Sequence, residues 1–224
     1  MAEGWFVTGT DTGVGKTVVA CALARLLVRM DYDTGVMKPV SAGGREDAED
    51  LIRSAGIDDG LDIVNPVALT EPLSPNLAAE RAGTPVDTEK ILDSYRALAQ
   101  NHKRMIVEGA GGLLVPLKDD YSTADLAREI GLPLIIVARA ALGTINHTLL
   151  TIEAARSRKL AIAGVIYNHV TPATGSPAES CSSGIISRIS GVPCLGTIPH
   201  ITNKSALCEI AEEHLELSSI MGDA

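Results

Sequence analysis

Residues 5–17 read WFVTGTDTGVGKT, and this stretch decides the fold. Its beginning, 5–9, predicts a short buried strand, and the glycines that follow predict a tight turn. From Thr17 to Met30 apolar residues return at the spacing of an amphipathic helix. A strand, a glycine-rich turn and a helix in this order are typical of a phosphate-binding loop, or P-loop.

The turn carries the groups that a triphosphate needs. Gly13 and Gly15 let the backbone bend so that its N–H groups face an anion, and the helix that follows adds the positive end of its dipole. Lys16 would contact the β- and γ-phosphates, and the Thr17 hydroxyl would hold Mg²⁺. Gly9 stands one residue before the place that the usual spacing, G-x-x-x-x-G-K-S/T, gives to the first glycine. The alternative is a turn that only joins a strand to a helix.

Short apolar runs alternate with helical patterns along the rest of the chain. We expect strands at 34–40, 105–107, 134–137, 162–167 and 194–198, and helices at 88–100, 123–130, 144–158 and 205–217. The run 134–137 does not alternate in polarity, which is typical of a strand covered by helices on both faces. The alternation predicts a single α/β domain over residues 1–224, with a doubly wound, mostly parallel sheet. Residues 56–85, with four prolines, predict loops and short helices beside the ligand cleft.

Composition limits the partners of the chain. It has 19 Lys and Arg against 28 Asp and Glu, a formal net charge of −9, so nucleic acid and anionic lipid are not expected as partners. No apolar run approaches the roughly 18 residues needed to span a bilayer, and residues 1–4 do not predict a signal peptide. The cysteines lack metal-ligand spacing and are expected to be reduced; they are Cys21, Cys181, Cys194 and Cys208. We therefore expect a cytoplasmic protein without membrane partners.

Charged residues stand where predicted strands end, which is where ligands of a parallel sheet bind. Glu108 follows the strand 105–107 and precedes a glycine-rich run, and its carboxylate suits Mg²⁺. A surface acid ahead of a loose turn is the alternative. Lys38 lies at the end of the second predicted strand and is either a cation for phosphate charge or a solvated side chain. Asp47 opens a helix-like run and is either an N-cap or a second Mg²⁺ ligand.

Several motifs in the same order resemble the dethiobiotin synthetase family. They lie at 9–17, 38–40, 71–75, 107–112, 142–147, Asn168 and 196–199. Because they extend from the first strand to about residue 200, they are together more specific than a P-loop alone. The resemblance implies a Mg²⁺- and ATP-dependent ligase. Its substrates would be 7,8-diaminopelargonate and CO₂ or bicarbonate, which it would join into a cyclic urea through a carbamate and its phosphorylated form.

The resemblance also implies roles for individual residues. Lys16 and Lys38, assisted by Thr12, would stabilise the negative charge on carbamate and phosphoryl oxygens. Mg²⁺ would be bound by Thr17, Asp47 and Glu108. The other nucleotide contacts would be Gly13, Val14, Gly15, Val18, Gly109, Ala110, Gly111, Asn168, Pro199, His200 and Ile201. The substrate contacts would be Ser41, Ala42, Gly112, Leu142, Gly143, Thr144, Ile145 and Asn146.

Three of these implied contacts have alternatives in the residues themselves. In the family the loop 142–146 leads into a helix whose N-terminus receives the substrate's carboxylate across a twofold interface, which implies a homodimer. Thr144 is otherwise a plain N-cap, and Asn168 is otherwise a turn residue. The family's small hydroxyl residue corresponds to Ala42, whereas this chain has its hydroxyl at Ser41.

Three rival functions are compatible with a P-loop. An amide-forming ligase of the cobyrinate type usually needs an additional glutamine-hydrolysing domain, which 224 residues do not accommodate. A ParA-like ATPase switch carries a lysine near the start of its loop, where this chain has Thr10 and Asp11. An inactive nucleotide-binding module would have a broken catalytic set, and only the offset between Ser41 and Ala42 points that way.

Overall fold

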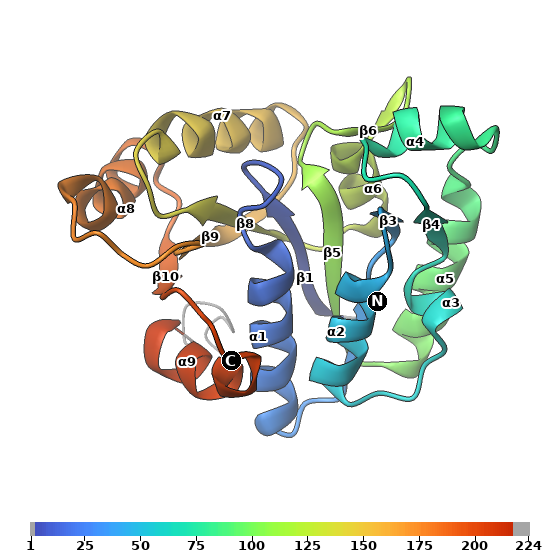
Figure 1. The fold of residues 1–224 in the computed structure, drawn as a ribbon, viewed down its shortest axis with the longest axis horizontal. Helices are drawn as coiled ribbons and strands as arrows, with labels where there is room; N and C mark the ends of the chain where they lie inside the picture. The colour runs from blue at the N-terminus through green and yellow to red at the C-terminus, as the bar shows by residue number, and fades with distance from the viewer. Residues whose placement is uncertain (1–2, 217–224) are drawn as a thin grey trace.

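The structure, a computed structural model, describes residues 3–216. Six strands form its central sheet: β1 (Glu3–Gly9), β2 (Thr34–Met37), β5 (Arg104–Gly112), β8 (Leu134–Arg139), β9 (Ile162–Asn168) and β10 (Cys194–Ile198). They lie in the order β10-β9-β8-β1-β5-β2, and every neighbouring pair is parallel (Figure 1). From β1 the chain passes to the edge strand β2, returns inward to β5, and then crosses to β8, β9 and β10 on the other side of β1, so the strand order reverses beside β1. The predicted doubly wound parallel sheet is confirmed.

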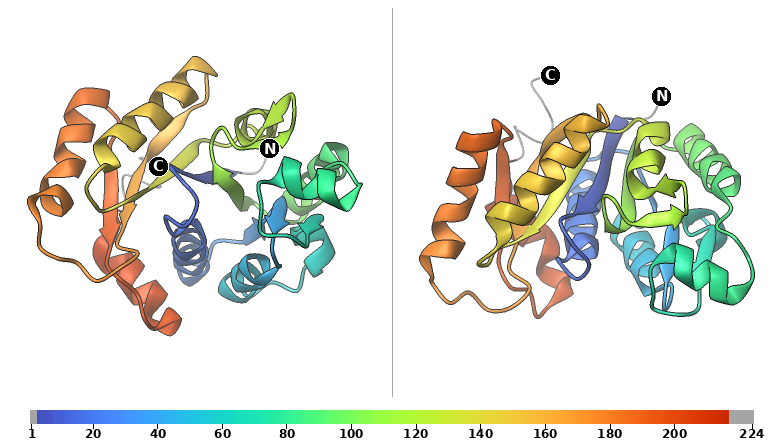
Figure 2. Two further views of the ribbon diagram at one scale, coloured as in Figure 1. Left: turned by 45° about the horizontal axis from the view of Figure 1, so that its top comes forward. Right: turned by 90° about the horizontal axis from the view of Figure 1, so that it is seen from above.

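Helices cover both faces of this sheet (Figure 2). One face carries α1 (Lys16–Arg29), α2 (Glu46–Ala55) and α9 (Leu207–His214), and the other carries α6 (Thr123–Ile130), α7 (Thr144–Ser157) and α8 (Pro177–Ser190). A further helix, α5 (Thr88–Asn101), packs beside α6. Side chains between the layers, such as Phe6, Leu23 and Ile135, are fully buried. Burial on both faces explains why the central strands read as continuous apolar runs.

The chain leaves the central sheet directly after β2. We predicted one strand over 34–40, but β2 ends at Met37, and β3 (Val40–Ala42) pairs with β4 (Val67–Leu69) in a separate two-stranded sheet. Pro39 is the physical reason, because proline has no N–H for the ladder and restricts the residue before it. The segment between β3 and α5 also contains α3 (Leu61–Val64) and α4 (Pro75–Ala82), which confirms the loops and short helices predicted for 56–85.

Besides β4, a helix and a hairpin were not predicted from the sequence. One is α8, whose sequence PAESCSSGIISRIS is rich in serine and has Ile186 as its only buried apolar residue, so it lacks a clear apolar period. A capping box between Ser176 and Glu179 begins it, and packing against α7 supports it. The other is a hairpin of β6 (Pro116–Lys118) and β7 (Tyr121–Ser122). The helix predicted at 205–217 is a 3₁₀ turn followed by α9, and residue 217 lies outside the described residues.

His102 joins three parts of the chain at the edge of the sheet remote from the P-loop. It caps the C-terminal end of α5, its Nδ1 lies 2.8 Å from Asp33 Oδ1, and its Nε2 lies 2.8 Å from Asp59 Oδ2. Burial lowers the pKa of the imidazole, but hydrogen bonds to the two carboxylates outweigh it and raise that pKa above its usual 6.5. The same contact lowers the pKa of Asp33. The ring is therefore structural, and its charged form donates to both carboxylates.

We predict that His102→Asn destabilises the protein in a pH-dependent way. The raised pKa means that the contribution of His102 is complete below pH 6.5 and is lost as pH rises through the folded-state pKa. The variant should lose about 1–2 kcal/mol of unfolding free energy at about pH 6 and less at about pH 9. Urea unfolding at the two pH values measures this, with the exposed His147→Asn as control. An equal loss at both values would contradict the prediction.

Candidate active site

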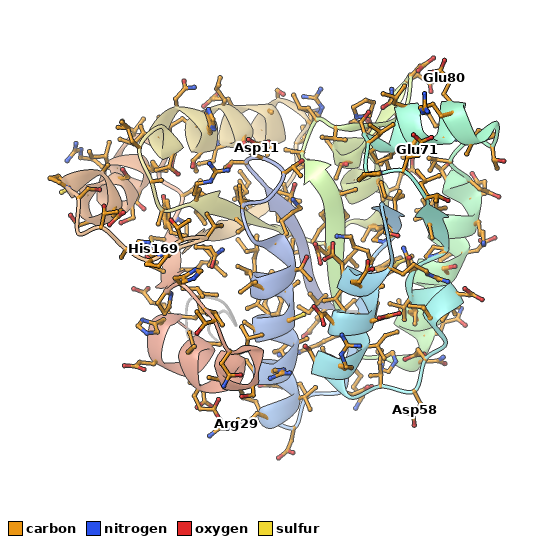
Figure 3. The ribbon with its side chains drawn as sticks, in the orientation of Figure 1. Asp11, Arg29, Asp58, Glu71, Glu80 and His169 are labelled. Atoms are coloured by element: carbon orange, nitrogen blue, oxygen red, sulfur yellow. The ribbon has the colours of Figure 1, made fainter. Side chains whose placement is uncertain are left out.

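The P-loop joins the end of β1 to the start of α1. Gly15 precedes the helix with φ 92°, a left-handed value that favours glycine, and Lys16 is the first helical residue. Asp11 lies at the tip of the loop, at the opposite end of α1 from Arg29 (Figure 3). A cavity of about 820 Å³ opens beside this loop. Its lining includes Thr12, Lys16, Thr17, Lys38, Asp47 and Glu108.

Lys16 lies folded against its own loop. Its side chain is buried, and its Nζ donates to the backbone oxygen of Asp11 at 3.1 Å. Burial is the main reason that the pKa of Lys16 is lowered; the Lys38 ammonium lowers it further, and Glu108 opposes the shift. Within the loop, the backbone N–H of Thr12 donates to the Asp11 carboxylate at 2.7 Å. The backbone oxygen of Asp11 is an uncharged acceptor, so an anion in the loop would be a better partner for the Lys16 ammonium.

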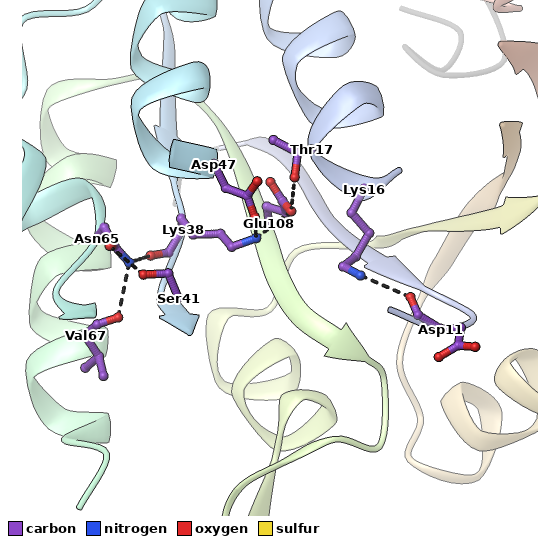
Figure 4. Close-up of polar contacts among 9 residues, drawn as sticks. All are labelled: Asp11, Lys16, Thr17, Lys38, Ser41, Asp47, Asn65, Val67 and Glu108. Atoms are coloured by element: carbon purple, nitrogen blue, oxygen red, sulfur yellow. Dashed lines mark hydrogen bonds and ion pairs between the residues drawn. The ribbon is translucent and has the colours of Figure 1, made fainter. Parts of the chain in front are cut away.

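A cluster of four side chains, Thr17, Lys38, Asp47 and Glu108, lines the same cavity as Lys16 (Figure 4). The Lys38 Nζ donates to Glu108 Oε1 at 2.6 Å and to Asp47 Oδ2 at 2.7 Å. The Thr17 hydroxyl donates to the same Glu108 Oε1 at 2.9 Å. The four residues come from α1, the β2–β3 connection, α2 and β5, so only the tertiary fold brings them together. The predicted convergence of Lys16, Lys38 and Glu108 on one cavity is what the structure has.

Ion pairing to Lys38 holds this cluster together. The side chains of Lys38 and Glu108 are 5% and 1% exposed, so neither charge is solvated. Burial lowers the pKa of Lys38, but the two carboxylates outweigh it and raise that pKa. Burial raises the pKa of Asp47, and the Lys38 ammonium more than reverses this and lowers it. Lys38 is therefore a protonated, desolvated cation and not the solvated side chain that was the alternative.

The cluster has donor atoms that fit Mg²⁺. Glu108 Oε2 is buried and has no hydrogen-bond partner among the described residues, so this oxygen can still accept an ion or an ordered water. The Thr17 hydroxyl and the Asp47 carboxylate lie beside the same glutamate and supply further oxygens, the ligand type that Mg²⁺ prefers. Within residues 3–216 no three His, Cys, Asp or Glu side chains form a metal-binding group. An ion here would therefore complete its shell with hydroxyl, water or phosphate oxygens.

The alternatives of helix capping for Asp47 and Thr144 are wrong. Arg45 is the N-cap of α2, and Asp47 lies in the first helical turn with its carboxylate on Lys38. Gly143 is the N-cap of α7, with φ 93°, and Thr144 is the first helical residue. Both capping residues lack a side-chain capping bond, which a sequence pattern based on Ser, Thr, Asp and Asn does not anticipate.

Asn168 anchors the P-loop to the end of β9. Its side chain is buried, and its Nδ2 donates to the backbone oxygen of Val14 at 3.0 Å. A Cβ atom on Gly15 would lie 2.1 Å from that Nδ2, so the close approach requires glycine. This bond joins residues 154 positions apart and was not predicted, because Asn168 was expected either to contact the nucleotide base or to be a turn residue.

The remaining predicted residues divide into two groups. The nucleotide contacts Gly13, Val18, Ala110 and Gly111 and the substrate contacts Ser41 and Ala42 line the cavity. Residues 199–201 and the 142–146 loop follow β10 and β8 and lie outside its lining. Gly109 and Gly112 also lie outside it, within β5. The Ser41 hydroxyl donates to Asn65 Oδ1 at 2.9 Å, so its proton points away from the cluster, and Asn65 was not among the predicted residues.

Known proteins resemble this chain in fold and in sequence. Residues 3–206 match a family described as an AAA domain. The fold resembles the septum site-determining protein MinD complexed with Mg-ADP from Pyrococcus horikoshii, with TM-score 0.64, 17% identity and all of both chains covered. It also resembles a ParA family ATPase from Chlorobium tepidum, with TM-score 0.58, 16% identity and coverage of 100% and 95%. At such identities these likenesses establish the fold alone.

Sequence relatives are more specific. An ATP-dependent dethiobiotin synthetase BioD from Thermodesulfovibrio yellowstonii is 37% identical over 238 residues, covering 99% of each chain. The protein of that name from Aromatoleum aromaticum is 42% identical over 205 residues, covering 88% of this chain and 90% of the relative. The one from Methanocaldococcus jannaschii is 46% identical over 170 residues, covering 74% and 79%. With these relatives matched over most of their length, the chain belongs to the ATP-dependent dethiobiotin synthetase family.

Proposed function

We propose that the protein closes a cyclic urea on 7,8-diaminopelargonate with CO₂ or bicarbonate, using Mg²⁺-ATP and releasing dethiobiotin, ADP and phosphate. One observation carries the proposal. Lys16 of the P-loop faces the same cavity as the ion cluster of Lys38, Glu108 and Asp47. A triphosphate on the loop would place its terminal phosphate between these groups, where a second substrate has access.

The proposed chemistry has three steps. One amine of the substrate adds to CO₂ and loses a proton, which gives a carbamate. A carbamate oxygen then attacks the γ-phosphorus of ATP, and ADP leaves. Finally the second amine attacks the carbamate carbon and loses a proton, the C–N bond forms, and the C–O bond to phosphate breaks. The phosphoryl transfer joins two negatively charged groups, the carbamate and the γ-phosphate, and the two amine additions need the reacting atoms to be aligned. Positioning and charge neutralisation therefore supply most of the catalysis.

The two lysines would supply the positive charge. Lys38 is kept protonated by its carboxylate partners, so its ammonium can stabilise the carbamate and the transferring phosphoryl oxygens. The Lys16 ammonium donates to the backbone oxygen of Asp11, an uncharged acceptor, so it can turn to the phosphates. Thr12 and the loop N–H groups would assist. The oxygens of Thr17, Asp47 and Glu108 would hold Mg²⁺, which neutralises phosphate charge when bound.

The ends of the two substrates would lie at the edges of the cavity. We propose that the nucleotide runs along the P-loop, with Gly109, Ala110 and Gly111 beside it, and that the base reaches the region of Asn168 and residues 199–201. That region adjoins the P-loop through the bond from Asn168 to Val14. The diamine would contact Ala42 and Gly112, and Ser41 would contribute through the backbone next to Ala42, since its hydroxyl proton is held by Asn65.

We further propose that the protein works as a cytoplasmic homodimer in which residues 142–146 receive the substrate's carboxylate. Exposed apolar residues support an interface at α7 and the turn before it, because Leu142 is 92% and Leu150 is 61% exposed. The four cysteines are free, which fits a reducing compartment. Among residues 3–216, none of the helices combines the length and apolar character needed to cross a membrane.

One test of the proposed function concerns the reaction itself. Purified protein with Mg²⁺-ATP should release ADP only when 7,8-diaminopelargonate and bicarbonate are both present, because phosphoryl transfer needs the carbamate as acceptor. A coupled ADP assay with each component omitted in turn measures this, and mass spectrometry identifies the cyclic urea. ADP release that ignores the diamine but responds to DNA or a protein partner would contradict it and favour a ParA-like switch. An amide product instead of a urea would favour another P-loop ligase.

The second prediction concerns Lys38. Lys38→Ala should lower kcat by about 100- to 1,000-fold, because it removes a preorganised cation from the reacting oxygens. The change also leaves buried Glu108 without its cation, so the melting temperature should fall, and turnover is measured where circular dichroism shows the variant folded. Lys118→Ala is the matched control, since that half-buried lysine bonds Thr88 outside the cavity lining. Near-normal turnover of Lys38→Ala would refute the assigned role.

A further inference from the structure

The backbone of Lys38 is held by a neighbouring loop and not by a sheet. Lys38 lies between β2 and β3, where its peptide groups have no partner in either ladder. Its N–H donates to the oxygen of Val64 at 2.8 Å, and its carbonyl oxygen accepts from Asn65 Nδ2 at 2.7 Å. The position of this lysine therefore depends on the segment that ends α3.

Asn65 has a buried amide that uses its whole hydrogen-bonding capacity (Figure 4). Its Nδ2 also donates to the oxygen of Val67 at 3.2 Å, and its Oδ1 accepts from Ser41 Oγ at 2.9 Å and from Arg45 Nε at 3.0 Å. Carbonyl oxygens only accept and a guanidinium only donates, so these partners leave a single orientation for the amide. That orientation directs an N–H of Asn65 at the Lys38 carbonyl.

Arg45 connects the same amide to the start of α2. It is the N-cap residue of that helix, and its guanidinium also donates to the backbone oxygens of Leu61 and Asn65, both at 2.8 Å. Its third partner is the exposed carboxylate of Asp62 at 2.7 Å. Because Asp47 lies in the first turn of α2, one buried amide is tied to the backbone positions of both Lys38 and Asp47.

We propose that Asn65 is a positioning residue for the ligase reaction: it fixes the backbone of Lys38 so that the ammonium is presented to the reacting oxygens. This rests on the proposed function. Asn65 is 1% exposed and is not among the residues lining the cavity, so it acts through Lys38. A lysine side chain has several rotatable bonds, and its Nζ is well placed only if its backbone is fixed as well as its two carboxylate partners.

A merely structural role for Asn65 makes a different prediction. If the amide only closed the loop after α3, its loss would lower stability, and any loss of activity would be the same with or without Lys38. If it positions Lys38, the two residues act as a unit, and the effects of changing them are not additive. The coupling between the two positions therefore separates the roles.

The test compares Asn65→Asp in the wild-type and Lys38→Ala backgrounds. Aspartate has the shape of asparagine and still accepts from Ser41 and Arg45, but in its ionised form it cannot donate to the Lys38 carbonyl. We expect kcat, per ATP-binding site counted by calorimetric titration, to fall about 10- to 100-fold, with KM for ATP within about threefold. In the Lys38→Ala background the same change should lower kcat by less than about threefold.

A milder variant and a control complete the test. Arg45→Lys keeps a charge opposite Asp62 but removes the Nε–H from Asn65, so kcat should fall about three- to tenfold, again only when Lys38 is present. If Asn65→Asp does not fold, the kcat of Arg45→Lys with and without Lys38 tests the positioning role instead. Asp62→Asn, on the exposed side of Arg45, should leave kcat within about twofold.

Two results would overturn the positioning role while the proposed function stands. One is a kcat of Asn65→Asp equal to that of the wild type. The other is an equal fall in kcat when Asn65→Asp is made in the wild-type and in the Lys38→Ala background. A wild-type protein that makes no ADP in response to the diamine would instead overturn the proposed function, and the role of Asn65 with it.

Discussion

The ion cluster of Lys38, Glu108 and Asp47 is the interaction on which the rest of the site depends. Glu108 lies on a central strand with its side chain 1% exposed, where an unpaired carboxylate would be strongly destabilising. The ammonium of Lys38 offsets that cost at 2.6 Å, and Asp47 shares the same cation. Because the three residues belong to different elements, the cluster is satisfied only when the β2–β3 connection, α2 and β5 are all in place.

Buried asparagines solve a related problem on both sides of the cavity. Each loop that brings a lysine to the cavity has backbone groups outside any ladder, and those groups still need partners. On one side the amide of Asn168 donates to the carbonyl of Val14, two residues before Lys16. On the other side the amide of Asn65 donates to the carbonyl of Lys38 itself. On each side of the cavity a buried side-chain amide therefore bonds a backbone carbonyl at or near the lysine.

The fold alone does not separate a ligase from a switch. The same parallel sheet and P-loop occur in MinD and in a ParA family ATPase, at 17% and 16% identity. In this chain a desolvated ammonium and two carboxylates line the same cavity as the P-loop lysine. Function belongs to the site built on the fold, and the family of this chain is shown by its sequence relatives.

The sequence by itself determined the alternation of strands and helices, the P-loop, and the placement of Lys38 and Glu108 at one edge of the sheet. These follow from short-range periodicity and from the order of elements, which residues near in sequence encode. From the sequence, the roles of Asp47 and Thr144 stayed open, because the structure places the helix caps at other residues. Helix α8 was not predicted, because packing and not an apolar period supports it, and the second strand was predicted to continue past Pro39. Only the tertiary structure paired Asn65 with Lys38 across 27 residues and Asn168 with Val14 across 154. The geometry of a buried hydrogen bond between distant residues is set by how the whole chain packs, and no local pattern records it.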